Sequence, residues 1–232
     1  MKALRSLLVL AFIGLATATA SAQFANSSSN SSASGSSIWN TVNTDGYSRI
    51  YVSYNPMNLK LDFPGAENAK FNGFSVGYLK GIGLSQRIPL YLEVGGALRY
   101  AAYSEDYFDE NLKYNIFALN IPVSVAYRFN ITDDFSISPN FGFDFRINLF
   151  GKGKYDYGDG DKEDWNVFDD QEMLDYDPTY VEAWKRFQMG WHIGVGLDYK
   201  ALHFGVDYGT DFMEIAEKTT FSTTSITLGF NF

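Results

Sequence analysis

The chain has 232 residues, no cysteine, 17% aromatic residues and a formal net charge of −9. The lack of cysteine excludes disulfides, thiolate metal sites and cysteine nucleophiles, and the acidic balance argues against a nucleic-acid partner, which would need a basic surface. An aromatic content this high is unusual for a soluble domain, so the order of apolar and polar residues along the chain decides the class of protein.

Residues 1–22 have the features of a secretory signal peptide. Lys2 and Arg5 give a positive start, an apolar run follows over 7–15, and small residues end in an A-x-A pattern at Ala22. The run is shorter than the roughly 20 residues that a membrane-spanning helix needs, which disfavours an N-terminal anchor. We expect cleavage near Ala22 and export of the mature chain from the cytoplasm.

The next segment, residues 23–45, is expected to be a flexible leader. Eight of the twelve residues from Asn26 to Ser37 are serine, and such a tract buries too little apolar surface to offset the entropy of ordering it. The folded part therefore begins near Gly46.

Beyond the leader, large apolar residues alternate with small or polar ones, which is the period of a β-strand. The segment 135–150 is the clearest, with Phe141 and Phe143 on one face and Gly142 and Asp144 on the other. Segments with this alternation are 47–55, 72–84, 90–103, 115–129, 135–150, 187–199, 202–209 and 223–232.

The polar faces of these segments carry few charges, and the two signs are nearly balanced. A soluble sheet would expose many lysines and glutamates there, whereas an enclosed interior must pair its charges because an unpaired buried charge is costly. The pattern therefore favours apolar faces that meet lipid and polar faces that enclose a narrow interior. We predict an interior polar network made of Glu93, Arg99, Arg128, Asp144, Arg146, His192, Asp198 and Asp207.

The connections between the segments also alternate in length. Those at 85–89, 130–134 and 200–201 are short, and those at 56–70, 104–112, 151–184 and 210–219 are longer. Short periplasmic turns and longer extracellular loops are typical of outer-membrane barrels. We predict an all-β, eight-stranded antiparallel up-and-down transmembrane β-barrel over residues 46–232, located in the bacterial outer membrane.

Two prolines interrupt this pattern. Pro122 and Pro139 lie inside predicted strands, where each removes a ladder hydrogen bond, and a closed barrel has no free edge to hide that loss. We expect a local β-bulge at each.

Five short motifs support the membrane interpretation. They are A-S-A-Q at 20–23, I-Y-V-S-Y-N-P at 50–56, N-I-P-V at 120–123, G-V-G-L-D-Y-K at 194–200 and L-G-F-N-F at 228–232. In this order they resemble the small outer-membrane β-barrel domain family of Bacteroidetes-type Gram-negative bacteria, with an OmpA/OmpX-like barrel. The resemblance covers roughly residues 46–232 and implies a location more than an activity. It also implies that the C-terminal Phe232 is the signal read by the barrel assembly machinery during biogenesis.

The segment 151–184 is expected to be an acidic surface loop, with eleven acidic residues against three lysines. One interpretation is a solvated loop that resists aggregation. Another is calcium binding by Asp159, Asp161 and Asp164, because hard cations take several carboxylate oxygens, although the spacing does not match an EF-hand loop. Divalent ions bridging the acids to lipopolysaccharide phosphates are a third. Interleaved aromatic residues such as Trp165 either form a recognition surface or pack the loop onto the barrel rim.

We expect a non-enzymatic outer-membrane protein, without catalytic residues or a cofactor, that displays its loops for adhesion, partner binding or envelope integrity. Its expected partners are an extracellular protein or glycan, outer-membrane lipids, and lipopolysaccharide, whose phosphates Lys185 and Arg186 could pair. The main alternative is a small, low-conductance pore, although eight strands enclose little more than side chains. A lipid A-modifying enzyme is less favoured because His192 and His203 face inward. A soluble lipocalin-like binder is the remaining alternative.

Overall fold

The computed structural model describes residues 45–62, 68–85, 87–108, 110–158, 161–172, 180–181 and 183–232. The predicted signal peptide and nearly all of the predicted leader lie outside these residues. The described part of the chain contains no helix long and apolar enough to cross a membrane.

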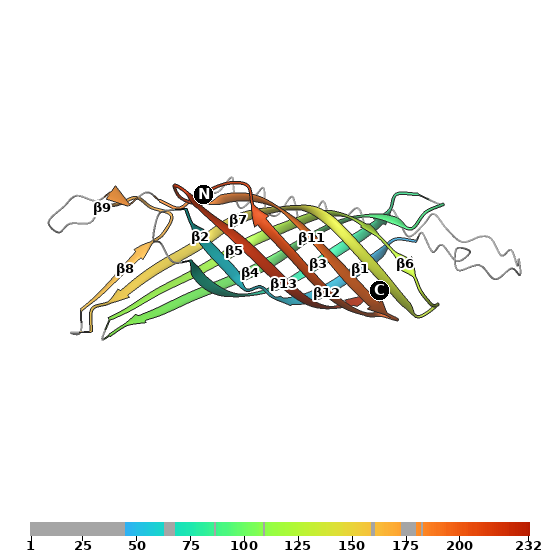
Figure 1. Cartoon of the computed structure of the whole chain (residues 1–232), viewed down its shortest axis with the longest axis horizontal. Coiled ribbons are helices and arrows are strands. Elements are labelled where there is room, and N and C mark those ends of the chain that lie inside the picture. The colour runs from blue at the N-terminus through green and yellow to red at the C-terminus, as the bar shows by residue number, and fades with distance from the viewer. Residues whose placement is uncertain are drawn as a thin grey trace, which may run out of the picture. The chain divides into compact units, whose positions relative to one another are not determined.

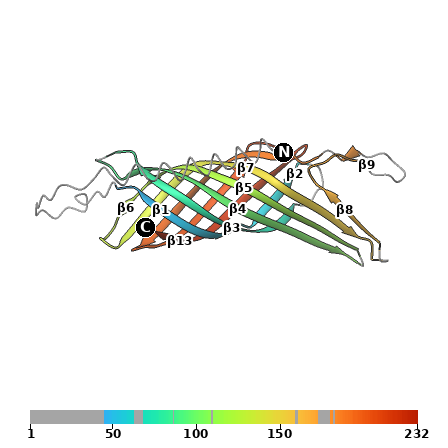
Figure 2. The same cartoon turned by 180° about the vertical axis from the view of Figure 1, so that it is seen from behind.

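The described part of the chain is built from β-strands. In chain order they are β1 (Tyr47–Tyr54), β2 (Met57–Leu61), β3 (Ala69–Gly83), β4 (Leu90–Tyr107), β5 (Glu110–Tyr127), β6 (Phe129–Asn130), β7 (Phe135–Asp156), β8 (Lys162–Asn166), β9 (Gln171–Glu172), β10 (Tyr180–Val181), β11 (Phe187–Tyr199), β12 (Leu202–Asp211) and β13 (Thr219–Asn231). Strands β1, β13, β12, β11, β7, β5, β4 and β3 pair in this order, and β3 pairs back with β1. The predicted eight-stranded antiparallel barrel is confirmed, and Figures 1 and 2 show its strands running obliquely side by side.

The first strand of the ring consists of two pieces, β1 and β2, separated at Asn55 and Pro56. Because proline has no backbone N–H, the ladder is interrupted there. Beyond the interruption, β2 resumes pairing with both β13 and β3. The ring is also closed at the chain end, where Ser48 and Phe232 exchange backbone hydrogen bonds of 2.9 Å. No ring strand in the barrel wall is left with a free edge of the kind that promotes aggregation.

The outside of the ring is covered by large apolar side chains contributed by all of its strands. Exposed examples are Ile50, Val52, Phe74, Val76, Leu98, Val125, Phe141, Phe143, Ile193, Val195, Phe204, Val206, Ile226 and Leu228. A continuous apolar surface of this extent is far larger than a water-soluble monomer exposes. It is the lipid-facing surface that the period-two pattern predicts.

Ile193, which is 53% exposed near the middle of β11, tests this assignment. We expect Ile193→Arg to lower the free energy of unfolding by about 2–4 kcal/mol, the cost of an arginine on the lipid face near the bilayer midplane. Denaturant unfolding in lipid vesicles, followed by tryptophan fluorescence, measures this change, with Ile193→Leu as the matched control. An arginine variant as stable as the leucine variant would show that this face does not meet lipid.

The two strand prolines are accommodated without the β-bulges that the sequence led us to expect. The β4–β5 register is the same on both sides of Pro122, and only the pairs opposite Pro122 and Ile121 are missing. Pro139 is on β7 and lies opposite the gap between β5 and β6. The register of these two strands with β7 is again unchanged across the gap. The bulge prediction is therefore wrong. At each proline the strands leave out ladder pairs, so no N–H is required there and the register does not shift.

The register shift that does occur lies elsewhere, between Phe117 and Ala118 on β5. Phe117 pairs with Phe150 and Ala118 with Asn148, so Leu149 is an extra residue on β7. Above this bulge the inward positions change from even to odd numbers, and Gly151 and Gly153 become buried. The predicted alternation therefore ends at Leu149.

Three strands continue well beyond the predicted segments. β7 runs to Asp156 and pairs there with β8, so the segment 151–184 begins as a hairpin rather than as a loop. The segment 104–112 is likewise a continuation of β4 and β5, with Phe108 at the turn in a left-handed conformation (φ 53°). Figure 1 shows β4, β5 and β7 extending past the other strands towards β8.

Candidate functional site

The interior polar network is centred on Asp198, which is 2% exposed. Its carboxylate oxygens lie 3.5 Å from Arg49 Nη2 and 3.4 Å from Arg128 Nη2. His203 Nδ1 lies 2.8 Å from Oδ1, and Asn231 donates to the same oxygen at 2.7 Å. Because every side of the carboxylate meets a cation or a donor, its burial is compensated. Asp198 thereby joins the first strand of the ring to the last three.

The end of the barrel at the short turns is filled by a connected group around Glu93. Arg49 Nη1 lies 3.8 Å from its carboxylate. Ser124 donates to Glu93 at 3.1 Å, and the Tyr47 hydroxyl also donates to it. The ring of Tyr47 meets the buried ring of Tyr91 edge to face, with 5.4 Å between the centroids. These side chains close this end of the lumen.

Two further ion pairs lie deeper in the barrel. His192 Nδ1 is 2.7 Å from one oxygen of Asp144, and Asn120 donates to the other oxygen at 3.0 Å. Arg146 is ion-paired and hydrogen-bonded to Asp211. Histidine and carboxylate in this arrangement hold each other in a fixed orientation.

Arg99 and Asp207 face a polar cavity of about 130 Å³ in the lumen. Asp207 accepts a hydrogen bond of 3.1 Å from Asn140. Arg99 is 7% exposed and makes no hydrogen bond or ion pair to another described residue. The side-chain oxygens of Asn120 and Asn140 are also buried without a protein partner. Since buried polar groups need partners, this lining favours a hydrated lumen.

All the residues predicted for the interior network are directed into the barrel, and two pairs of them are in contact, Asp144 with His192 and Arg128 with Asp198. Arg49, Tyr47 and Asp211 also belong to this network and were not predicted from the sequence. Arg49 and Tyr47 share the inward parity of the first segment, 47–55. Asp211 lies four residues after Asp207 and therefore also points inward, but the segment 210–219 was predicted to be a connection. What these residues do for the protein stays a prediction.

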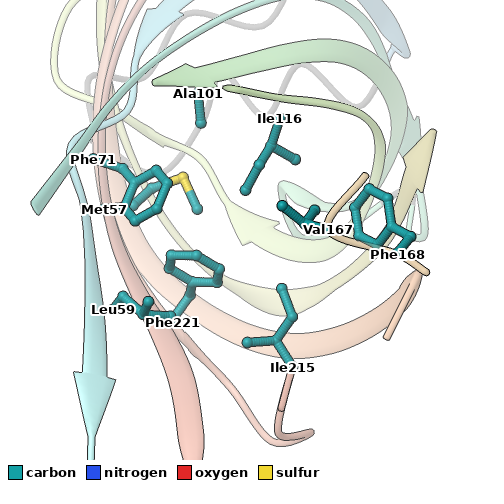
Figure 3. Close-up of a cluster of buried hydrophobic side chains, with 9 residues drawn as sticks. All are labelled: Met57, Leu59, Phe71, Ala101, Ile116, Val167, Phe168, Ile215 and Phe221. Carbon is teal, nitrogen blue, oxygen red and sulfur yellow. The ribbon is translucent and has the colours of Figure 1, made fainter. Parts of the chain in front are cut away.

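The opposite end of the lumen is covered by an apolar lid. It consists of Met57, Leu59, Phe71, Ala101, Ile116, Val167, Phe168, Ile215 and Phe221. Figure 3 shows that these side chains come from barrel strands and from the connections that contain Val167, Phe168 and Ile215. Tyr103, Tyr114, Trp165 and Trp184 pack against it. Phe71 stacks on Tyr103 at 5.1 Å, and Tyr114 stacks on Trp184 at 5.5 Å between ring centroids. Aromatic residues of segment 151–184 thus pack onto the barrel rim, one of the two predicted alternatives.

Two glycines of β7 make room for the lid. A side-chain carbon at Gly151 would collide with Val167 and Phe168, and one at Gly153 would collide with the Trp165 indole. The Val167 N–H donates to the Gly151 carbonyl at 3.2 Å, and Trp184 N–H donates to the Val167 carbonyl at 2.8 Å. The chain after β8 therefore folds back over β7 and seats its apolar residues in the barrel mouth.

Beyond the lid, the extended parts of four strands form what we call the projecting sheet: residues 103–107 of β4, 110–115 of β5, 151–156 of β7, and β8. One face carries aromatic side chains such as Tyr114 and Trp165, which contact each other edge to face at 5.8 Å. The other face carries Lys113, Lys152 and Lys154. β7 has 22 residues, about twice the 9–11 that a tilted transmembrane strand needs, so the projecting sheet lies outside the lipid-facing band.

The edge strand β8 is held to β7 by two exposed ion pairs. Lys152 Nζ lies 2.7 Å from Asp164, and Lys162 Nζ lies 3.0 Å from Asp156. The hydrogen bond from Lys152 holds the pKa of the Asp164 carboxyl below its ordinary value of 3.8, and the hydrogen bond from Lys162 does the same for the pKa of Asp156. A carboxyl with a lowered pKa stays ionised until acid conditions, so both ion pairs persist at neutral pH and are lost as the pH falls through the lowered values.

We expect an NMR titration of the aspartate carboxyl carbons to give a pKa below 3.8 for Asp164, and a higher pKa for Asp164 in a Lys152→Gln variant. Removing the lysine removes the hydrogen bond that favours the ionised form. In the same variant the pKa of Asp156 should stay low, because Lys162 is unchanged. An Asp164 midpoint unaffected by Lys152→Gln would contradict this assignment.

The calcium candidates are not brought together in the described residues. Asp159 lies outside them, Asp161 is exposed, and Asp164 is paired with Lys152. Across the part of the chain that the structure describes, no three metal-ligating side chains converge. Calcium binding by segment 151–184 stays a prediction.

The closed ring, the lipid-facing outside and the polar interior define an integral outer-membrane β-barrel protein. The chain matches the family of outer membrane proteins with a beta-barrel domain over residues 24–214, and it belongs to that family. It is therefore located in the outer membrane of a Gram-negative bacterium. No curated protein matches it in sequence.

Several solved structures are similar to the chain in fold. Ail, the attachment invasion locus protein of Yersinia pestis, is 14% identical with a TM-score of 0.46, and the match covers 81% of this chain and 99% of Ail. Neisserial surface protein A is 13% identical with a TM-score of 0.40, over 81% and 97% of the two chains. The N-terminal barrel of OprF from Pseudomonas aeruginosa is 13% identical with a TM-score of 0.31, over 78% and 97%.

Proposed function

We propose that this outer-membrane barrel is a non-enzymatic display protein, which holds the projecting sheet outside the cell for adhesion, partner binding or envelope integrity. The observation that carries the proposal is the length of β7, which has 22 residues and continues through residues 151–156 beyond the lipid-facing band. Four hydrogen-bonded strands form a rigid surface there. Short turns at the other end support an extracellular position for this sheet.

The same features support an OmpA/OmpX-like subtype, and the Bacteroidetes assignment rests on the sequence motifs. Phe232, the proposed signal for the assembly machinery, is 66% exposed at the end of the last strand, where another protein can reach it. Cleavage near Ala22 and the flexible leader remain part of the proposal.

The interior of the barrel supports neither a lipid A-modifying enzyme nor a pore. His192 and His203 are both hydrogen-bonded to buried or half-buried aspartates inside the barrel, so their ring nitrogens are walled off from the acyl bonds of membrane lipids. The lumen is covered by the apolar lid at one end and filled around Tyr47 and Glu93 at the other. A closed lumen of this kind favours display over conduction.

The chemistry of the far end of the projecting sheet favours a protein partner with a basic surface. Glu105, Asp106, Glu110 and Glu163 lie there, and complementary charge directs such encounters. A glycan is the alternative partner. Ail has been solved with a heparin analogue, sucrose octasulfate, but a polyanion of that kind would be repelled by these acids.

The test is a variant in which β4–β5 and β7–β8 are trimmed, removing 105–111 and 155–163, with the lid segment 165–168 kept. Cells or vesicles carrying the trimmed barrel should lose attachment to the surfaces that the full chain binds. Asp133→Asn, in the short turn after β6, is the matched control and should attach normally. Unchanged attachment by a trimmed, folded barrel would refute the proposal.

A further inference from the structure

The charges on the outer face of the projecting sheet are sorted by distance from the barrel. In the row nearest the barrel, Asn115 pairs with Lys152, and in the next row Lys113 pairs with Lys154. The third row carries Asp106 and Asp156, which pair with Asn111 on either side. On β4, β5 and β7 the cations therefore lie next to the barrel and the acids lie farther away, while β8 places Asp164 opposite Lys154 and Lys162 opposite Asp156. We call Lys113, Lys152 and Lys154 the lysine patch.

The lysine patch points away from the lid, towards the outside of the barrel. Successive side chains of a strand point to opposite faces, and Gly151 and Gly153 face Val167, Phe168 and Trp165. Lys152 and Lys154 must then lie on the other face, and register places Lys113 beside Lys154. The patch thus continues the outward face that carries Phe117 and Phe150 below it.

The cations of this patch are poorly compensated by the protein. Lys113 and Lys154 are direct cross-strand neighbours, and like charges in this position destabilise a sheet. Asp164 is the one acid of β8 opposite Lys154, and its carboxylate lies 2.7 Å from Lys152. Neither Lys113 nor Lys154 makes a hydrogen bond or ion pair to any other residue that the structure describes. An anion placed between them would remove the repulsion.

The position of the patch identifies where that anion comes from. Phe117 and Phe150 form a cross-strand pair with 6.4 Å between ring centroids, and Phe150 is 70% exposed. At about 3.3 Å per residue, Lys152 lies about 7 Å and Lys154 about 13 Å beyond Phe150 along the strand. Strand tilt reduces these heights by about a quarter. The patch therefore lies at the level of the lipid headgroups, directly above an aromatic pair of the lipid-facing surface.

We propose that Lys113, Lys152 and Lys154 bind the phosphate groups of a phosphorylated glycolipid of the outer leaflet. The inference rests on the extracellular position of the sheet given in the proposed function. Lysine ammonium groups bind phosphate as point charges, and Phe117 and Phe150 contact the acyl chains of the same lipid. One row farther out, Asp156 is neutralised by Lys162, and Asp106 supplies a negative charge that disfavours anions approaching from solution, so the patch favours a phosphate presented from the membrane.

The experiment uses the full chain, refolded in neutral detergent, and native mass spectrometry with added lipid. The probes are bisphosphorylated lipid A, the same lipid with its phosphates removed, and inorganic phosphate. We expect the phosphorylated lipid to bind, and Lys113→Gln/Lys154→Gln to bind it about tenfold more weakly, since each basic residue near a charged lipid surface adds attraction. Lys162→Gln, which removes a lysine from the same face but outside the patch, should bind like the wild type.

The proposal is overturned if the double variant binds the phosphorylated lipid as tightly as the wild type, or if both lipids bind equally. Binding of inorganic phosphate as tight as that of the lipid would also overturn it, because the source would then be a free anion. Each variant is first checked for the folded band in unboiled SDS gels. Because the assay contains no protein partner, its failure leaves the display function standing, and failed attachment of the full chain leaves lipid binding intact.

Discussion

Replacing Asp198 by alanine is expected to destabilise the barrel by about 3–5 kcal/mol, the usual cost of removing one partner from a buried ion pair. The variant leaves Arg49 and Arg128 facing each other without their shared carboxylate, and His203 and Asn231 without an acceptor. Two cations would then repel each other inside the barrel, where an uncompensated buried charge is costly. Urea unfolding in lipid vesicles measures the change.

Two controls separate this effect from a general loss of negative charge. Asp134→Asn removes an exposed acid in the turn before β7, whose oxygen lies 3.9 Å from Lys200 Nζ, and should leave stability within about 0.5 kcal/mol. Arg128→Met in the Asp198→Ala background should restore part of the loss, because it removes one of the uncompensated cations. If Asp198→Ala unfolded at the same urea concentration as the wild type, the network would not support the barrel.

Gly153→Leu is expected to lift the lid off the barrel mouth. A leucine there would occupy the space of the Trp165 indole, and overpacking of this kind costs about 1–3 kcal/mol. The lid can relieve the clash by opening, which would raise the open population by about tenfold or more. A single cysteine at Ser75, which lines the cavity, reports the opening in a chain without native cysteines.

The measurement is the rate at which a membrane-impermeant maleimide labels Ser75→Cys on intact cells. Slow labelling is expected with the native lid and fast labelling with Gly153→Leu. Lys152→Leu is the matched control, since the same side chain one residue earlier points to the opposite face and should leave labelling slow. Equal rates in all three backgrounds would mean that the lid does not close the lumen.

The alternation of apolar and polar residues was enough to predict the barrel, because lipid on one side and a narrow lumen on the other impose a period of two on every ring strand. It could not reveal the bulge at Leu149, since Leu149 and Phe150 are both apolar and either fits a lipid-facing position. The alternation also did not predict the strands beyond Phe150, because the outward residues there are lysines and no longer phenylalanines. The acidic composition of segment 151–184 suggested a solvated loop and masked the start of the hairpin.

The contacts of the candidate site join residues of different strands, and the pattern within one strand does not predict them. Asp198 was predictable from its inward parity, but its partners come from β1, β12 and β13. The lid depends on Val167 and Phe168 meeting Gly151 across a reversal of the chain. Glycine spacing at 151 and 153 was the available signal, and it gains meaning only when the residues that fill the space are known.

Electrophoretic mobility with and without boiling tests the central claim that the chain forms a closed barrel in the outer membrane. Protein from the outer-membrane fraction should run as a compact folded band in cold SDS and shift to its unfolded position after heating, because a sealed ring of hydrogen-bonded strands resists the detergent. A single band that does not shift, or recovery of the protein from the soluble periplasm, would contradict the account and mean that the apolar faces pack against each other.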